Sequence, residues 1–352
     1  MNSNFFTDIK IENFKSLHSV ELKGCNRINL LIGRPNVGKS NILEALSLFS
    51  LPHNLSPIFS RFNRSLTHYI RFENEGELFF NGNTSSNSPI NIETNLVNCS
   101  LKSDELEGLS IEFQGKDYEA FIKLLFDERT GVPTMKSSIP YAQYFKAVKK
   151  YIFDKDNQNT PTRHTPFRRQ PSFLSPPFGN NLMQIIDTNL ELTEFCNTFF
   201  KEYGLNLLFD KSSSTLKIMK QIKNREGEIS KTFILPYKSI ADTLQRIIFY
   251  KTAIVSNNNS ILLFEEPEAH SFPPYIVHVT QEIISSVSNQ FFITTHSPDV
   301  LDDLVDNARK DLAVFIVHWE NGETIAKKLT EEQLEEVSQY GIDLFTNIEN
   351  YS

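Results

Sequence analysis

The chain has 352 residues, enough to bury a large core, and its 43 acidic and 35 basic side chains give a net charge of −8. Hydrophobic residues at 39% exclude wholesale disorder, no run of 18 apolar residues predicts a membrane-spanning helix, and the first residues lack the pattern of a secretory signal. The three cysteines, Cys25, Cys99 and Cys196, are too scattered for a metal knot or a disulfide framework, so we expect a cytoplasmic protein.

The first hundred residues predict strands and one helix. Alternating apolar residues predict strands at 8–14 and 19–24, and a continuous apolar run predicts a strand buried on both faces at 27–33. Apolar residues at helical spacing follow at 40–49. Segments 71–82 and 89–97 predict further strands of an antiparallel layer.

The pattern between residues 101 and 210 becomes helical. Helices are predicted at 117–128, 141–154 and 182–203, and five prolines in the stretch 157–181 predict an irregular loop. This loop carries the basic cluster Arg163, His164, Arg168 and Arg169, whose simpler interpretation is a solvent-exposed loop. An acidic chain would need such a local patch to bind nucleic acid, so DNA is a conceivable partner that the overall charge does not favour.

The last third of the chain predicts a parallel α/β unit. Strands at 214–222 and 230–237 precede a helix at 240–255. Two strongly apolar strands at 260–266 and 290–296 then flank a helix at 276–288, which is the pattern of parallel strands with a helical crossover. A hairpin that turns at Asn321-Gly322 and an acidic helix at 331–337 follow.

A glycine-rich loop joins the buried strand at 27–33 to the first helix. It matches GxxxxGK[ST], and its backbone N–H groups and the helix N-terminus are suited to hold a polyphosphate. Lys39 is expected to reach the β- and γ-phosphates, and Ser40 to ligate Mg²⁺. The predicted nucleotide-binding residues are Gly33, Arg34, Pro35, Asn36, Val37, Gly38, Lys39, Ser40 and Asn41.

The loop sequence GRPNVGKS also resembles that of small ribosome-assembly GTPases. A GTPase needs an NKxD motif to recognise guanine and a DxxG switch soon after the loop, and the chain contains neither. We therefore reject a GTPase.

Two further motifs predict the catalytic groups. The strand at 260–266 ends in Glu265 and Glu266, of which the first is expected to bind the metal and the second to act as general base on the attacking water. His296, at the end of the strand at 290–296, is expected to contact the γ-phosphate and to hold that water.

GKSN, EEPEAH and TTHSP in this order resemble the ABC-type ATPases of the SMC, RecF and OLD group, and in particular their short AAA-type relatives in bacteria. The resemblance covers residues 5–100 and 205–345. It implies an α/β fold, an ABC/SMC-type P-loop ATPase head with a mixed sheet, an antiparallel β layer and a helical insert. It also implies ATP and Mg²⁺ as cofactors and a homodimer, or a higher homo-oligomer, that closes around ATP.

In this group each ATP is capped by a signature loop from the other copy. The matching segment is 238–246, in which Ser239 would cap the following helix and, with Asp242, face the partner's γ-phosphate. The segment departs from the family because Ala241 stands where glycine is usual. The chain also has glutamate at 265 where SMC proteins mostly have aspartate, and it has no recognisable Q-loop glutamine.

On this basis the chain divides into three parts. Residues 1–100 form the N-terminal part of the head with the Walker A loop, and residues 101–210 form a helical insert with the proline-rich loop. Residues 211–352 form the C-terminal part with the signature, Walker B strand, switch histidine and terminal hairpin.

Three functions are compatible with such a head. The first is an ATPase that acts as sensor and regulatory scaffold for a separate effector protein, a nuclease or toxin, in anti-phage defence. The second is a RecF/SMC-like DNA-binding ATPase in DNA repair or maintenance. The third, a transporter motor, is disfavoured because the chain lacks an LSGGQ-like signature, and we expect no membrane partner. Only 56 residues follow His296, too few for the TOPRIM nuclease domain of OLD-like proteins, so we expect any nuclease on another polypeptide.

Overall fold

A computed structural model describes residues 5–51, 66–85, 88–104, 108–116, 121–126, 133–137, 148–155, 171–271 and 273–351. Its α-helices are α1 (Lys39–Ser47), α3 (Leu182–Thr188), α4 (Leu190–Lys201), α5 (Asp242–Val255), α6 (Pro273–Ser285), α7 (Pro298–Ala308) and α8 (Glu331–Tyr340). Short 3-10 turns are η2 (Leu66–His68), η3 (Glu75–Leu78), η4 (Phe80–Gly82), η6 (Tyr237–Ser239), η7 (Arg309–Asp311) and η8 (Ile348–Asn350).

The central sheet has the order β16-β15-β3-β14-β13-β9 over the described residues. Its strands are β3 (Ile28–Ile32), β9 (Val148–Tyr151), β13 (Ile261–Glu265), β14 (Gln290–Thr294), β15 (Leu312–Glu320) and β16 (Glu323–Lys328). All neighbours pair in parallel except β15 and β16, which form the predicted hairpin at the edge. Asn321 and Gly322 both have positive φ, as a tight hairpin turn requires.

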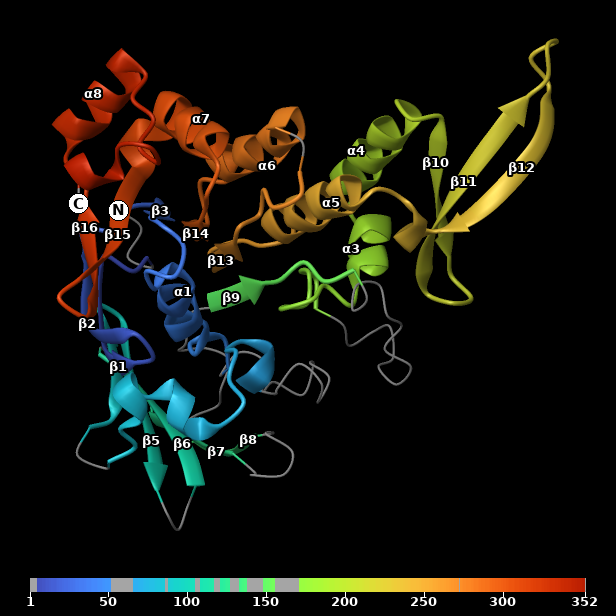
Figure 1. Cartoon of the computed structure of the whole chain (residues 1–352). Coiled ribbons are helices and arrows are strands. Elements are labelled where there is room, and N and C mark those ends of the chain that lie inside the picture. Colours follow the sequence, from blue (N-terminus) through green and yellow to red (C-terminus); the bar gives the residue numbers. More distant parts are fainter. Residues whose placement is uncertain are drawn as a thin grey trace.

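The central sheet separates two hydrophobic cores, because successive side chains of a strand point to opposite faces. In β3, Leu30 belongs to the core that lies under helices α3 to α8, whereas Leu31 belongs to the core that contains α1. Helix α1 is therefore enclosed between the central sheet and a second sheet, as Figure 1 shows.

The second sheet is antiparallel and has the order β2-β1-β4-β5-β6-β7-β8. Its strands are β1 (Asp8–Phe14), β2 (Leu17–Lys23), β4 (Ile90–Thr94), β5 (Val97–Asp104), β6 (Gly108–Gly115), β7 (Phe121–Phe126) and β8 (Pro133–Ser137). A third sheet, β10 (Leu205–Asp210), β11 (Thr215–Lys223) and β12 (Ile229–Pro236), projects from the helical side of the molecule (Figure 1).

These layers confirm the predicted α/β class with a mixed sheet and an antiparallel β layer. The predicted strands at 8–14, 27–33, 214–222 and 230–237 are present, as are the helices at 182–203, 240–255 and 276–288. No helix among the described residues is long and apolar enough to cross a membrane.

Two predicted helices and one predicted strand are wrong. Residues 121–126 of the predicted helix 117–128 form β7, because a short apolar run is ambiguous by pattern alone and here pairs with β6. Residues 148–151 of the predicted helix 141–154 form β9 in the central sheet. Residues 75–82, predicted as strand, form the turns η3 and η4.

The region 101–210 is therefore helical only in α3 and α4 over its described residues, and the part before residue 138 extends the antiparallel sheet. The basic cluster Arg163, His164, Arg168 and Arg169 lies outside the described residues.

Candidate nucleotide-binding site

Three strand ends meet at one edge of the central sheet. Strand β14 lies between β3 and β13, and Thr294, its last residue, pairs with Leu31 on one side and Glu265 on the other. Because the three strands are parallel, the segments that follow them emerge at the same edge. The P-loop follows β3, Glu266 follows β13, and His296 follows β14.

The P-loop needs both of its glycines because neighbouring chain segments approach it closely. A Cβ atom on Gly33 would lie 2.1 Å from the carbonyl oxygen of Val317. Gly38 has a φ of 103°, and a Cβ atom there would lie 2.6 Å from the Thr324 hydroxyl and 3.0 Å from the Ser16 hydroxyl. The edge hairpin β15–β16 therefore shapes the loop from outside.

Lys39 and Ser40 begin helix α1 directly after this loop. The Lys39 side chain turns back along the loop, where Nζ donates to the carbonyl oxygens of Gly33 and Arg34, each at 2.7 Å. Burial lowers the pKa of Lys39 to about 8, and the nearby Glu266 carboxylate partly opposes this. A buried ammonium group is thus held at the position from which a P-loop lysine meets phosphate.

The other predicted loop residues lie around this position with different partners. Asn41 donates to the Ser16 hydroxyl at 2.8 Å, which connects the start of α1 to the β1–β2 turn. Arg34 points outward and forms an exposed ion pair of 2.6 Å with Glu349. Asn36 has a φ of 61°, and Val37 is buried in the core around α1.

Glu265 lies at the tip of β13 and is surrounded by cationic and hydroxyl groups. Arg71 Nη2 lies 2.9 Å from Glu265 Oε1, and Lys150 Nζ lies 3.7 Å from Oε2. Burial would raise the pKa of Glu265, but Lys150, a hydrogen bond from Ser40 and Arg71 together lower it. The carboxylate is therefore held in its ionised form beside Ser40.

Ser40 and Glu265 are the two residues predicted to bind Mg²⁺, and the structure brings them together. Hydroxyl and carboxylate oxygens are the hard ligands that Mg²⁺ prefers, and phosphate oxygens and water complete such sites. No group of three or more His, Cys, Asp or Glu side chains able to hold a metal occurs in the described part of the chain. The donor set thus fits a metal held jointly with a nucleotide.

Glu266 and His296 face each other at the same edge. His296 Nε2 lies 3.5 Å from Glu266 Oε1, and both side chains are partly exposed. Glu266 has a φ of 44°, an unfavourable conformation for a non-glycine residue, and its N–H donates to the Thr294 carbonyl oxygen at 3.0 Å. The two side chains thus meet directly beyond the ends of β13 and β14.

Glu268 is a positioning residue that the sequence did not reveal. One of its oxygens accepts from the Thr295 hydroxyl at 2.7 Å and from the His296 backbone N–H at 2.9 Å. The other oxygen is buried and has no hydrogen-bond partner in the described residues. Burial raises the pKa of Glu268 despite these bonds. Glu268 therefore connects the loop after β13 to the loop after β14.

The site also contains Glu44, Lys15, Arg71 and Lys150, none of which belongs to a recognisable motif. Glu44, in the middle of α1, is fully buried and accepts from Lys15 Nζ at 2.5 Å and Arg71 Nε at 2.6 Å. Lys150 lies on β9 and is almost fully buried.

The predicted signature segment differs in one respect from expectation. Ser239 does not cap α5: it ends the turn η6, and α5 begins after Ala241, which has no side-chain cap. The reason is that Ile240 is extended and buried, which delays the helix start by two residues. Ser239 is exposed, and Asp242, in the first turn of α5, forms a 2.7 Å ion pair with Lys155.

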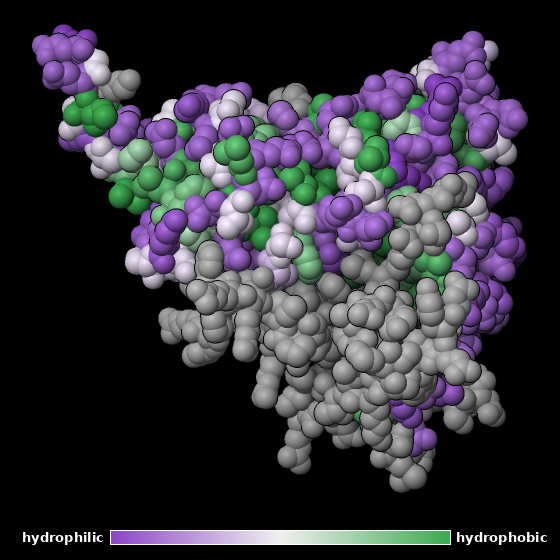
Figure 2. All heavy atoms as spheres, turned by 180° about the vertical axis from the view of Figure 1, so that it is seen from behind, coloured by the Kyte–Doolittle hydropathy of each residue, from purple (hydrophilic) through white to green (hydrophobic). Residues whose placement is uncertain are grey.

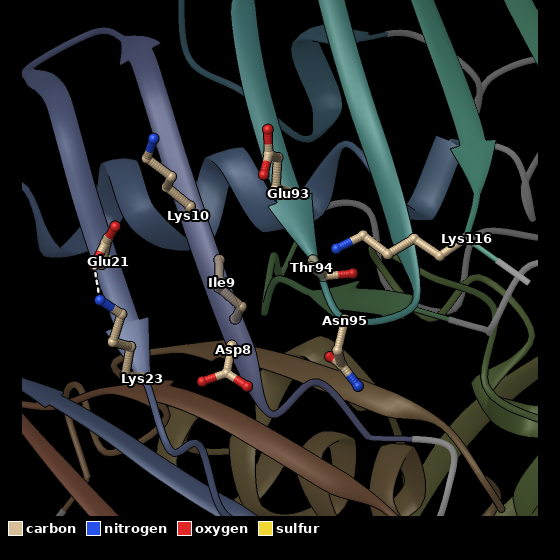
Figure 3. Close-up of a pocket in the computed structure, with 9 residues that line it drawn as sticks. All are labelled: Asp8, Ile9, Lys10, Glu21, Lys23, Glu93, Thr94, Asn95 and Lys116. Carbon is tan, nitrogen blue, oxygen red and sulfur yellow. Dashed lines mark ion pairs between the residues drawn. The ribbon is translucent and has the colours of Figure 1, made fainter.

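A hollow of about 250 Å³ lies on the outer face of the antiparallel sheet, at the end of β1 opposite Ser16 (Figure 3). Lys10 lies across from Glu21 on β2 and Glu93 on β4, and its ammonium group pairs with Glu12 at 2.6 Å. Such exposed pairs contribute little to the stability of a fold, so we interpret this face as solvated sheet surface.

Comparison with known proteins gives one family match and one distant relative. The family described as "AAA ATPase domain" matches residues 6–173. A Helicobacter pylori protein named "ATP/GTP phosphatase" is 20% identical over 348 residues, which cover 87% of this chain and 89% of that protein.

Solved SMC head domains share the fold. One, bound to the C-winged helix domain of ScpA, is 14% identical with a TM-score of 0.50 and covers 93% of this chain and 99% of its own. Another, from Pyrococcus furiosus with an extended coiled coil and the C-terminal domain of ScpA, is 12% identical with a TM-score of 0.50 and covers 96% and 99%. The SMC-head fold is therefore confirmed.

Proposed function

We propose that this chain binds ATP with Mg²⁺ at the P-loop and hydrolyses it there. The observation that carries the proposal is the meeting of Lys39, Ser40, Glu265, Glu266 and His296 at one edge of the central sheet. These residues come from three segments, the first of which lies more than two hundred positions before the other two, and together their side chains suit a polyphosphate with its metal.

Each residue has a distinct role in this proposal. Lys39 and the loop N–H groups neutralise the β- and γ-phosphates, and Ser40 and Glu265 hold Mg²⁺, which when bound offsets the charge of the phosphate oxygens. Glu266 accepts a proton from the attacking water, and His296, 3.5 Å away, orients that water. Glu268 holds the His296 backbone so that the two groups stay in reach of each other.

We further propose that two copies close around ATP, with Ser239 and Asp242 of one copy facing the P-loop of the other. The exposure of Ser239 and Ala241 directly before the 14-residue helix α5 supports this, because the positive end of a helix dipole stabilises phosphate. A homodimer is the simplest assembly that places this surface on a second P-loop.

The proposed cellular role is regulation of a separate effector, a nuclease or toxin, in anti-phage defence. A surface suited to a protein partner lies on the projecting third sheet, where Ile229, Phe233 and Ile234 of β12 are 54%, 45% and 59% exposed. Figure 2 shows apolar surface at the base of this projecting arm, among polar side chains.

A DNA-binding ATPase in repair or maintenance is the second candidate. Lys220, Arg225 and Lys231 are exposed on the same projecting sheet, in a chain whose net charge is −8. They provide a local basic surface within the described residues, as DNA binding by an acidic protein requires.

The first prediction concerns the P-loop lysine. Lys39→Ala should weaken ATP binding at least about tenfold, because it removes a charged donor to the phosphates. Calorimetric titration with ATP and Mg²⁺ measures this, with Lys10→Ala, an exposed lysine on the outer sheet face, as the matched control. Equal affinity in the Lys39→Ala and wild-type proteins would refute the assignment of the loop.

The second prediction concerns sharing of the site between copies. Ser239→Arg blocks the surface offered in trans and leaves that chain's own P-loop intact, so a mixture with Lys39→Ala should regain about one competent site per heterodimer. ATP hydrolysis is measured before and after mixing, with subunit exchange verified by differently tagged chains. No recovery after exchange would argue against a shared site.

The third prediction concerns the partner. Glu266→Gln should keep ATP bound, so a pull-down from the native host with this variant should retain a protein that the ATP-free form releases, because regulation requires different affinities for the two states. A variant with Phe233→Ser and Ile234→Ser on β12 should lose that protein. Recovery of the chain alone in every nucleotide state, together with salt-sensitive binding of duplex DNA, would favour the DNA-binding candidate instead.

A further inference from the structure

Arg71 connects two carboxylates, one fully buried and one partly exposed. Its Nε atom lies 2.6 Å from Oε1 of the fully buried Glu44, and its Nη2 atom lies 2.9 Å from Oε1 of Glu265. A guanidinium group can do this because its donors form a planar fork. Arg71 therefore joins helix α1, which begins at the P-loop, to the tip of β13.

The Glu44 side of this bridge is firmly held. Lys15 donates to both Glu44 Oε2 and the carbonyl oxygen of Arg71, each at 2.5 Å, so the backbone of Arg71 is fixed near α1. A buried carboxylate that lost its partners would be strongly destabilised, which makes this half of the bridge costly to break.

The Glu265 side of the bridge is exchangeable. The Arg71 side chain is 67% exposed, so water can reach its Nη2 group, and an exposed ion pair contributes little free energy. Lys150 Nζ, fixed by the carbonyl oxygen of Tyr69 at 2.9 Å, faces the second Glu265 oxygen. Both oxygens of the predicted metal carboxylate thus face a cation.

We propose that Arg71 is a positioning residue that makes Mg²⁺ binding depend on the nucleotide. Without nucleotide, its Nη2 group holds Glu265 and opposes a divalent cation at Ser40 and Glu265. When the phosphates enter with the metal, Nη2 leaves Glu265 for a phosphate oxygen, while Nε stays on Glu44. This inference rests on the proposed function and adds an order of binding to it: the metal binds weakly by itself and tightly only together with the nucleotide.

The proposal predicts that removing the Arg71 side chain changes the affinity for metal and the affinity for nucleotide in opposite directions. In Arg71→Ala without nucleotide, Glu265 loses a competing cation, so Mn²⁺ used as the probe for Mg²⁺ should bind about threefold to tenfold more tightly. ATP measured in the presence of EDTA should bind more weakly by a similar factor, because a phosphate contact is lost. A purely structural role would weaken both.

Mn²⁺ binding is followed by the electron paramagnetic resonance signal of free Mn²⁺, and thermal unfolding confirms that each variant is folded. Lys10→Ala, which removes an exposed cation on the outer sheet face, is the control and should change neither affinity. Arg71→Lys keeps the positive charge but cannot bridge both carboxylates, so it should also tighten Mn²⁺ binding. This variant provides the test if Arg71→Ala does not fold.

Glu265→Gln should abolish the gain in Mn²⁺ affinity when combined with either variant, because the carboxylate for which the two cations compete is gone. Unchanged or weaker Mn²⁺ binding in a folded Arg71 variant would overturn the proposal. The metal titration needs no nucleotide, so failure of the wild-type protein to bind ATP would refute the proposed function without affecting this test.

Discussion

The parallel pairing of β3, β14 and β13 is the constraint on which the candidate site depends. Thr294 on the middle strand pairs with both Leu31 and Glu265. The P-loop, the paired glutamates and the histidine loop therefore leave the sheet at the same level. Parallel strands of this kind are apolar on both faces and need a core on each side. The two cores around α1 and around α3 to α8 therefore stabilise the geometry of the site as well as the fold.

Charge balance is the second organising feature. Lys15, Arg71 and Lys150 surround the two carboxylates of Glu44 and Glu265. Each of the five residues comes from a different segment of the chain: Glu265 lies on β13, and the other four lie within the first 151 residues. Burial alone would raise the pKa of the Glu265 carboxylate, but its cationic neighbours lower the pKa and keep the group ionised. In this structure both oxygens of the Glu265 carboxylate face these cations.

The motifs allowed the P-loop, Glu265, Glu266 and His296 to be predicted, because each motif directly follows a strongly apolar strand. The contacts of Arg71 and Lys150 could not be predicted, since they depend on where β9 and the turns after η2 lie in space. Lys150 was assigned to a helix because two adjacent lysines interrupt the apolar alternation of β9. Ser239 was expected to cap α5, but burial of Ile240 moves the helix start to Asp242.

The most direct test of an ATPase site at this sheet edge compares ATP binding and turnover in wild-type protein and Glu266→Gln. We expect Mg²⁺-dependent release of phosphate by the wild type, and unchanged ATP affinity with at least about a hundredfold slower release in the variant, because an amide cannot accept a proton from water. Phosphate release at the wild-type rate by Glu266→Gln would contradict the assignment of the base. Absence of Mg²⁺-dependent release by both proteins would contradict an ATPase site at this edge of the sheet.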